Sequence, residues 1–462
     1  MGLDTRPYER KGFFEERPYD IIALARSLTP LMNELHKVKH DHRFWLRVLG
    51  DILMAAVNRK EIIKLEENFA THTFSINGWT TPTDKAFRQK WLKYHLKALI
   101  YSKKLIQFLN AVKNSDQISL GARGKIISRI ENYTYIEEHY PIFIFQRNDS
   151  SRNKLNRIAA KIDNLFIRNV LLQLPKVAVE YFGSMYDKIV LYAPQSKKFH
   201  FEHIHSPFTR LLLAKYQQNG AELIEYQGGG FAGLLSHNPG PVMYEVVDKY
   251  ITYGWKIHEK DIPGKPYRLI EFKEAYDFYQ SQKREKYYDL TICFSLIGES
   301  TIENYKWAFN TISEQLDREK YLKVLLRPRP KGKGLTADQE IKEVFNPDAF
   351  FDIDKGVKPM AEVCSNSSVI VQLSHPSTNF VECLFSRIPV LVFNTSKNDS
   401  KLAKQINPIL EDHQILFNYP QDIAASLNSI SIEDRISMME NPTIEVENIV
   451  ELLTSSGKYS ET

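Results

Sequence analysis

Between residues 288 and 417, short and almost continuous apolar runs alternate with helical or loop segments. The runs are YDLTICFSLIG, KVLLRP, AFFDID, SSVIVQLSHPS, IPVLVF and QILF. Strands that are apolar on both faces are typical of a parallel sheet with helices on each side. The C-terminal half therefore predicts an α/β domain with a parallel sheet.

The region before this domain shows two different sequence patterns. From about Tyr19 to Leu174 apolar residues recur at three- and four-residue spacing, which predicts helices. From Asp187 the β-branched runs DKIVLYAP, AELIEYQGGG and DKYITYGW predict a second sheet. Residues 256–288 show no convincing strand, and we interpret them as the connection between domains.

The fold class expected is α/β, with two Rossmann-like domains facing a cleft and a helix-rich N-terminal region. A chain of 462 residues is too long for one ordinary core. The expected domains are residues 1–260, with the helix-rich region and the first sheet, residues 261–442, with the second sheet, and residues 443–462 as a C-terminal helix and tail. Ligands of open parallel sheets bind beyond the carboxyl ends of the strands, so polar residues at those ends are the candidates for a site.

The net charge and the lengths of the apolar runs exclude some classes of binding partner. Lys and Arg outnumber Asp and Glu by 61 to 56, a formal charge of +5 that is too small and dispersed to indicate nucleic acid. This mild positive charge suits anionic substrates and at most peripheral contact with an acidic membrane surface. No apolar run reaches the roughly 18 residues of a membrane-spanning helix. We expect a cytoplasmic protein, with the inner face of the plasma membrane as an alternative.

The cysteines and the start of the chain fit this expectation. Cys293, Cys364 and Cys383 lie in or beside apolar runs without CxxC spacing, which predicts buried, reduced thiols and no zinc site. The first residues lack the apolar segment of a secretory signal.

The clearest candidate site follows the run that ends at Leu373. The turn Ser374–Thr378 opens a helix, and the free N–H groups there, with the side chains of His375, Ser377 and Thr378, predict a phosphate site. Glu382, one turn further on, is a candidate for binding ribose hydroxyls. The alternative is that the hydroxyls only cap the helix and that Glu382 is an exposed acid.

Two further loops follow strands of the same series. Arg327 and Arg329 come directly after KVLL and suit bidentate binding of a phosphate, with a solvated basic loop as the alternative. Gly298 and Ser300 follow the first strand and are candidates for nucleotide contact or for capping the next helix.

A glycine loop, YQGGGFAG, follows the strand run AELIE. Gly228 and Gly229 allow a tight turn or the close approach of a ligand, and a structural turn is the alternative. Glu225, Glu245 and Asp248 flank the loop and are candidates for a catalytic base or nucleophile, although each alone is typical of a surface acid.

The N-terminal helices carry a dense polar and aromatic segment, LMNELHKVKHDHRFWLRVLGD. Asn33, His36 and Arg43 are candidates for binding the acceptor. Packing of Trp45 in the core with solvated neighbours is the alternative, and the spacing of the histidines gives no metal motif.

Several of these segments together resemble the surface-polysaccharide transferases of O-antigen loci, a family first named from leptospiral sequences. LTPLMNELHKVKHDHRFWLRVLGD is similar to its N-terminal motif, YQGGGFAG to its glycine loop, DKYITYGW to its Thr-Trp-Gly-Trp segment, and SHPSTNFVECLFSRIPVLVF to its His-Pro-Ser-Thr signature. Gln227 is followed directly by Gly228, where the family pattern has a histidine.

The His-Pro element also resembles that of the glycosyltransferase-B enzymes that use CMP-activated Kdo or sialic acid. This resemblance implies that His375, Ser377 and Thr378 hold the nucleotide phosphate and that Glu382 holds the ribose. It also implies a metal-independent enzyme without a further cofactor. The function expected is transfer of a sugar from a nucleotide donor, such as a CMP-linked acidic sugar, to a surface-polysaccharide acceptor. The alternatives are a CDP-polyol-dependent polyol-phosphate transferase and an inactive glycan-assembly scaffold.

Overall fold

The computed structural model of the protein describes most of the chain in two compact units. The N-terminal unit comprises Phe13–Tyr226 and Gly240–Tyr250, and the C-terminal unit comprises Met1–Gly12, Gln227–Pro239 and Ile251–Thr462. The domain boundaries expected at residues 260 and 442 stay a prediction. The residues described are 18–58, 91–121, 124–136, 145–189, 197–202, 204, 206–230, 232–234, 240–282, 286–294, 299–328, 345, 347–348, 350–354, 358–395 and 400–454.

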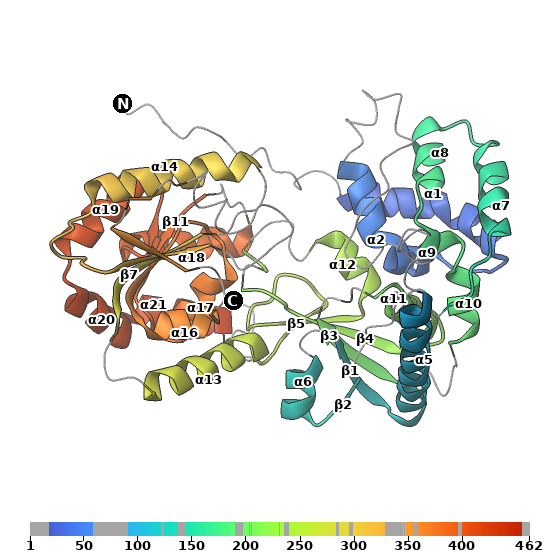
Figure 1. Ribbon diagram of the computed structural model, residues 1–462, viewed down its shortest axis with the longest axis horizontal. Helices are drawn as coiled ribbons and strands as arrows, with labels where there is room; N and C mark the ends of the chain where they lie inside the picture. Colours follow the sequence, from blue (N-terminus) through green and yellow to red (C-terminus); the bar gives the residue numbers. More distant parts are fainter. Residues whose placement is uncertain are drawn as a thin grey trace. The chain divides into compact units, whose positions relative to one another are not determined.

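The first sheet has six strands in the order β2-β1-β3-β4-β5-β6, and the β2–β1, β1–β3 and β3–β4 pairs are parallel (Figure 1). The boundary between the units falls within β5. The strands are β1 (Gln117–Gly121), β2 (Thr134–Tyr135), β3 (Lys198–Glu202), β4 (Glu222–Tyr226), β5 (Lys249–Thr252) and β6 (Asp261–Pro263).

Helices make up most of the rest of the N-terminal unit, as the sequence predicts. The helices α1 and α2 pack on each other, and α11 packs on α2. The helices are α1 (Pro18–His36), α2 (His42–Asn58), α5 (Trp91–Asn114), α6 (Gly124–Glu131), α7 (Ser150–Ala159), α8 (Leu165–Leu172), α9 (Lys176–Val179), α10 (Phe182–Asp187), α11 (Pro207–Gln218) and α12 (Pro241–Val246).

The second sheet contains all six apolar runs found in the sequence. Its order is β12-β11-β10-β7-β8-β9, and every neighbouring pair is parallel. The strands are β7 (Tyr288–Phe294), β8 (Val324–Pro328), β9 (Phe351–Ile353), β10 (Ser367–Gln372), β11 (Val390–Phe393) and β12 (Leu416–Phe417).

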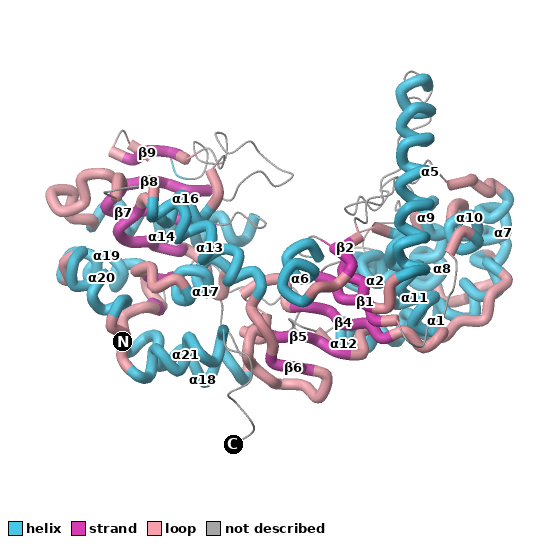
Figure 2. The backbone as a smooth tube through the Cα atoms, turned by 90° about the horizontal axis from the view of Figure 1, so that it is seen from below, coloured by secondary structure: helices cyan, strands magenta, loops and turns pink. Residues whose placement is uncertain are grey.

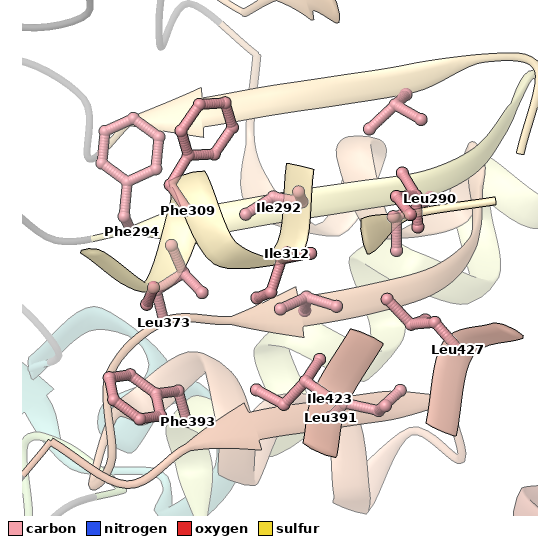
Figure 3. Packing of buried hydrophobic residues seen from close by; sticks show 14 of the residues in the cluster. Leu290, Ile292, Phe294, Phe309, Ile312, Leu373, Leu391, Phe393, Ile423 and Leu427 are labelled. Atoms are coloured by element: carbon pink, nitrogen blue, oxygen red, sulfur yellow. The ribbon is translucent and has the colours of Figure 1, made fainter. Parts of the chain in front are cut away.

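Helices cover this sheet on both faces. In Figure 1, α14 and α19 lie on one side and α13 with α16 on the other. Figure 3 shows Phe309 and Ile312 of α14 and Ile423 of α19 packed over Ile292 and Leu391 of the strands. The helices are α13 (Tyr267–Ser281), α14 (Glu299–Gln315), α16 (Met360–Ser365), α17 (Thr378–Phe385), α18 (Lys401–Asp412), α19 (Pro420–Ser429), α20 (Ile432–Glu440) and α21 (Ile444–Thr454).

The strand order of the second sheet locates its ligand-binding edge. Numbered along the chain, the strands β7 to β12 lie in the order 3-2-1-4-5-6, so the direction of winding reverses between β7 and β10. In open α/β sheets, ligands bind at the carboxyl ends of the strands at this reversal. The segment that leaves β10 and enters α17 starts at that point.

The segment 256–288, in which the sequence shows no convincing strand and which we interpret as the connection between domains, contains regular structure. It contains β6 and the 15-residue helix α13. Figure 2 shows α13 running beside α16 and α17, which it contacts. The sequence did not indicate α13 because its apolar residues are spread around the helix and alternate with charges, so the segment lacks a clear apolar stripe.

The fold class expected from the sequence is confirmed: the protein is α/β, with two parallel six-stranded sheets flanked by helices and a helix-rich N-terminal region. The three cysteines are buried and unpaired. Among the described helices, none has the length and the apolar sequence that a membrane crossing requires.

Candidate functional site

The candidate site is the β10–α17 turn, residues 374–378, at the carboxyl end of β10. Ser377 is the N-cap residue of α17, and its Oγ accepts a hydrogen bond from the backbone N–H of Phe380 at 3.2 Å. A serine at the N-cap satisfies a backbone N–H that has no partner within the first turn, and so favours the start of a helix at Thr378. The first turn of α17 therefore begins directly beyond the edge of the sheet.

The hydroxyl of Thr378 is held by a different part of the chain. Its Oγ1 accepts a hydrogen bond from the N–H of Gly230 at 3.2 Å. A side chain on Gly230 would not fit, since an added Cβ would lie 2.7 Å from the Cβ of Val381 and 3.3 Å from the Cα of Thr378. The glycine loop, residues 227–230, therefore lies directly on the first turn of α17.

The third hydroxyl, that of Ser374, is held from inside the sheet. Ser374 Oγ accepts a hydrogen bond at 2.8 Å from Nε2 of Gln372, whose Oε1 accepts one at 2.9 Å from Nδ2 of Asn379. This chain of contacts links the end of β10 to the second residue of α17. It fixes the amide of Gln372 and with it the side chain of Ser374.

The three hydroxyls share one property. Ser374, Ser377 and Thr378 each accept a hydrogen bond from the protein, and no described residue accepts a hydrogen bond from any of them. A hydroxyl has one proton to donate and two lone pairs to accept with. Each of the three therefore keeps its O–H group to donate to a ligand.

His375 lies inside the turn and is 1% exposed. Its Nε2 lies 3.3 Å from Oδ1 of Asn407, and its peptide bond to Pro376 is cis. Burial lowers the pKa of His375 to about 4, while the hydrogen bond to Asn407 opposes the shift. The imidazole is therefore neutral near pH 7 and adds no positive charge to the turn.

The predicted ribose carboxylate, Glu382, is buried and paired. Its Oε1 accepts a hydrogen bond from Nε of Arg268 at 3.0 Å, and Nη1 of the same arginine donates to the carbonyl oxygen of Gly228 at 3.0 Å. Sequence reasoning missed Arg268, because it lies in the segment interpreted as a connection and far along the chain from both partners. No local pattern would have found it.

The glycine loop is also fixed by its own first residue. Nε2 of Gln227 donates to the carbonyl oxygen of Gly229 at 2.8 Å, and its Oε1 accepts from the N–H of Tyr253 at 2.9 Å. The predicted donor-site residues Gly228, Gly229, Thr378 and Glu382 are thus brought together, with Arg268 and Gly230 as the connecting residues.

The structure does not bring Arg327, another of the predicted donor-site residues, into this cluster. Arg327 is buried at the end of β8, where it forms an ion pair with Asp354 and donates to the carbonyl oxygen of Lys358. Its guanidinium is therefore engaged within the protein. Ser300 lies in the first turn of α14, whereas Gly298 and Arg329 lie outside the described residues.

The predicted acceptor residues Asn33 and His36 lie in a network within the N-terminal unit. Asn33 donates to the carbonyl oxygen of His40 and accepts from the N–H of His40 and from Nε1 of Trp45. Nε2 of His36 lies 3.0 Å from the carbonyl oxygen of Ala178, and burial lowers the pKa of His36 to about 4. Both side chains therefore have structural partners.

The three candidate catalytic carboxylates belong to the N-terminal unit as well. Glu245 pairs with Nε2 of His42 at 2.8 Å, and its backbone carbonyl oxygen accepts from Nε of Arg43, the third predicted acceptor residue. Asp248 accepts from the N–H of Leu223 at 2.9 Å and lies 3.6 Å from Nη2 of Arg43.

Glu225, at the carboxyl end of β4, is almost completely buried. It acts on Arg47 of α2: burial lowers the pKa of the Arg47 guanidinium to about 10, and the negative charge of Glu225 opposes this shift. Sequence reasoning had not connected these two residues, since their positions follow only from the packing of α2 in this unit.

Among solved structures, the chain is similar to the wall teichoic acid polymerase TagF. The identity is 12%, the TM-score is 0.39, and the match covers 82% of this chain and 95% of that chain. It is also similar to UDP-GlcNAc 2-epimerase from Neisseria meningitidis bound to UDP-GlcNAc, at 12% identity and a TM-score of 0.42, over 73% and 96% of the two chains. The S. aureus MnaA structure with UDP matches at 13% identity and a TM-score of 0.41, over 73% and 95%.

No curated protein matches the chain. A family match is found, however: residues 56–433, which are more than half of the chain, match the LIC12162 family transferase. This match supports the resemblance that the sequence motifs indicated, while the likeness to transferases using CMP-sugars stays a prediction. The chain belongs to the LIC12162 family of transferases.

Proposed function

We propose that the protein transfers a sugar from a nucleotide donor to a surface-polysaccharide acceptor, and that the phosphate of the donor binds at the β10–α17 turn. Membership in a family of transferases supports the reaction class. The observation that carries the proposal is the set of three hydroxyls, Ser374, Ser377 and Thr378, whose oxygens accept from the protein and whose protons stay available.

These hydroxyls suit a phosphate for a physical reason. Phosphate oxygens only accept hydrogen bonds, and bonds to a charged acceptor are about twice as strong as bonds between neutral groups. The turn lies at the start of a helix, where backbone N–H groups and the helix dipole also favour an anion. It also lies at the reversal of strand order, where α/β sheets bind their ligands.

In this proposal the negative charge of the leaving nucleotide is stabilised mainly by fixed hydrogen-bond donors. His375 is neutral and Arg327 is engaged by Asp354, so neither contributes a free positive charge in this conformation. Donors that are already oriented stabilise a developing charge without further rearrangement. Metal independence and the lack of a further cofactor stay predictions.

Glu382 is proposed to bind the ribose through Oε2, since no described residue is bonded to that oxygen. For the acceptor side we propose Glu245 as the first carboxylate to test. Its side chain is 30% exposed and is oriented by His42, whereas Asp248 accepts a backbone N–H and Glu225 is buried. Of the predicted acceptor residues we propose Arg43 as the first to test, since its side chain is 36% exposed and lies beside Asp248.

The first experiment is a thermal-shift measurement with CMP, UDP, GDP and CDP. A nucleotide at a hundred times its Kd stabilises the folded state by about 2.7 kcal/mol, which corresponds to roughly 5 to 10 °C for a domain of this size. We expect one nucleotide to raise the melting temperature. If none does, the protein does not bind nucleotides, and the scaffold alternative replaces the proposal.

The second experiment identifies the group transferred. The protein is incubated with the acceptor glycan and either CMP-linked sugars or CDP-glycerol, and the released nucleotide is measured. Release from a nucleotide sugar supports the proposal. Release from CDP-glycerol alone would show that the protein is a polyol-phosphate transferase.

A further inference from the structure

Arg268 occupies a position that the proposed reaction does not yet explain. It is the second residue of α13, and its side chain is 31% exposed, yet two of its nitrogens bond to different elements. Nε contacts the carboxylate of Glu382 in α17, and Nη1 contacts the carbonyl oxygen of Gly228 in the glycine loop, both at 3.0 Å. One planar guanidinium therefore joins three segments that are distant in sequence.

The carboxylate of Glu382 depends on this contact. Its side chain is only 8% exposed, and a carboxylate without a partner is unfavourable at such a position. Only Oε1 is bonded to a described residue, so the guanidinium fixes the orientation of the carboxylate and leaves Oε2 to accept from a ligand. A carboxylate held at one oxygen in this way presents the other in a defined direction.

The second contact of Arg268 fixes the glycine loop against the same helix. Gly228 is held by Arg268 and Gly230 by the hydroxyl of Thr378. The backbone of Gly230 also lies so close to Val381 that an added Cβ would be 2.7 Å from the Cβ of Val381, so the loop packs tightly on α17. The carboxylate of Glu382 and the hydroxyl of Thr378 are thereby kept in a fixed relation.

We infer that Arg268 is a positioning residue that orients Glu382 and the glycine loop for binding the ribose of the nucleotide. This inference rests on the proposed function, because it assumes that a nucleotide binds at the turn. It assigns Arg268 a role distinct from phosphate binding. Loss of Arg268 should therefore weaken the recognition of the ribose and leave the recognition of the phosphate largely intact.

The test compares ribonucleoside monophosphates with their 2′,3′-dideoxy analogues. The affinities of CMP, UMP and GMP and of their dideoxy forms are measured by calorimetry for the full chain and for the variants Arg268→Gln, Arg268→Lys and Lys273→Gln. Lys273 is the matched control, because it forms an exposed ion pair with Asp277 on the same helix.

We expect the wild type and the Lys273→Gln variant to prefer the best-binding ribonucleotide over its dideoxy form by about tenfold or more, the loss expected for one hydrogen bond to a charged group. In Arg268→Gln this preference should fall to within about twofold, with the affinity for the dideoxy form nearly unchanged. Arg268→Lys keeps a cation beside Glu382 but not the planar fork, so it should also lose most of the preference. If Arg268→Gln fails to fold, Arg268→Lys decides the question.

The outcomes separate the two proposals. A wild-type protein that binds none of the nucleotides overturns the proposed function and, with it, the role of Arg268. Binding with no ribose preference in the wild type overturns the ribose role of Glu382 together with the role of Arg268, while the phosphate site stands. An unchanged preference in the folded Arg268 variants, or an equal loss of affinity for both nucleotide forms, overturns only the role of Arg268.

Discussion

The start of α17 and the paired helices α1 and α2 both carry polar side chains that the sequence marks as ligand-binding, but they differ in what the protein has already bonded. At α17, the hydroxyls of Ser377 and Thr378 accept from backbone N–H groups and keep their protons. In α1, both ends of the Asn33 amide are engaged, by His40 and by the indole of Trp45.

This difference shows why residue type alone does not identify a binding site. Buried polar groups are almost always hydrogen-bonded within the protein, so a polar side chain near the core can be a structural link that contacts no ligand. A ligand-binding group must keep a donor or acceptor that the protein has not used. By that criterion the β10–α17 turn is the better candidate, and Arg327 belongs with Asn33 among the structural groups.

Replacing Arg327 with methionine should have the largest effect on stability. The substitution leaves the buried carboxylate of Asp354 without its guanidinium, and breaking a buried pair in this way costs about 4 kcal/mol. Urea unfolding of the full chain measures the change. Arg318→Met, which removes an exposed pair with Asp348, is the matched control and should cost about 1 kcal/mol or less.

The same variant can also show that Arg327 binds the ligand and is not a structural group. If Arg327→Met unfolds at the same urea concentration as the wild type and binds nucleotide far more weakly, the guanidinium serves the ligand and not the fold.

A pH dependence of stability should follow from His375. The ordinary pKa of 6.5 applies in the unfolded chain, whereas burial lowers the pKa of His375 to about 4 in the folded one. The unfolded state therefore binds the proton more readily between these values. The contribution of His375 to the free energy of unfolding should be fully present above pH 6.5. It should be lost as the pH drops toward 4, a loss on the order of 3 kcal/mol.

Urea unfolding at pH 7.5 and at pH 5 tests this dependence. His375→Gln removes the titrating group and keeps a hydrogen-bonding side chain, so it should reduce the loss of stability at pH 5 relative to the wild type. An identical loss in the two proteins would mean that His375 is not buried in a neutral form. The turn would then carry a positive charge, and hydrogen bonds alone would no longer account for the site.

The Asn33→Ala variant should have a smaller effect, confined to the N-terminal unit. It removes the acceptor for the completely buried indole N–H of Trp45, and an unsatisfied buried donor costs about 2 kcal/mol. Asn156→Ala, at an exposed position in α7, is the control and should change little. Unchanged stability with a weaker interaction with the acceptor glycan would restore the acceptor role that the sequence suggested.

The second sheet was largely predictable because its strands are buried on both faces. Runs such as SSVIVQ are short and β-branched, show neither the three- and four-residue spacing of an amphipathic helix nor the alternation of a half-exposed strand, and end at a turn signal. The first sheet was less predictable. Its strand β1 (Gln117–Gly121) is short and lies between helices, so the helical pattern on either side dominated our interpretation.

The candidate site was predictable only in part, for a similar reason. Strand ends and turn residues are local signals, and they indicated Ser377, Thr378 and Glu382 as candidates. Pairings between distant segments are not local, so neither the contact of Arg268 with Glu382 nor the pairing of Arg327 with Asp354 could be found. Whether a polar group is free for a ligand depends on such pairings, and only the structure gives them.

Removing two of the three hydroxyls tests the phosphate site at the β10–α17 turn most directly. The nucleotide that most stabilises the wild type is titrated into the wild type and into the Ser374→Ala/Thr378→Val double variant, after both are shown to fold. Loss of two hydrogen bonds to a charged phosphate should weaken binding by at least about 100-fold. If the double variant binds the nucleotide as tightly as the wild type, the phosphate does not bind at the β10–α17 turn, and the central claim is wrong.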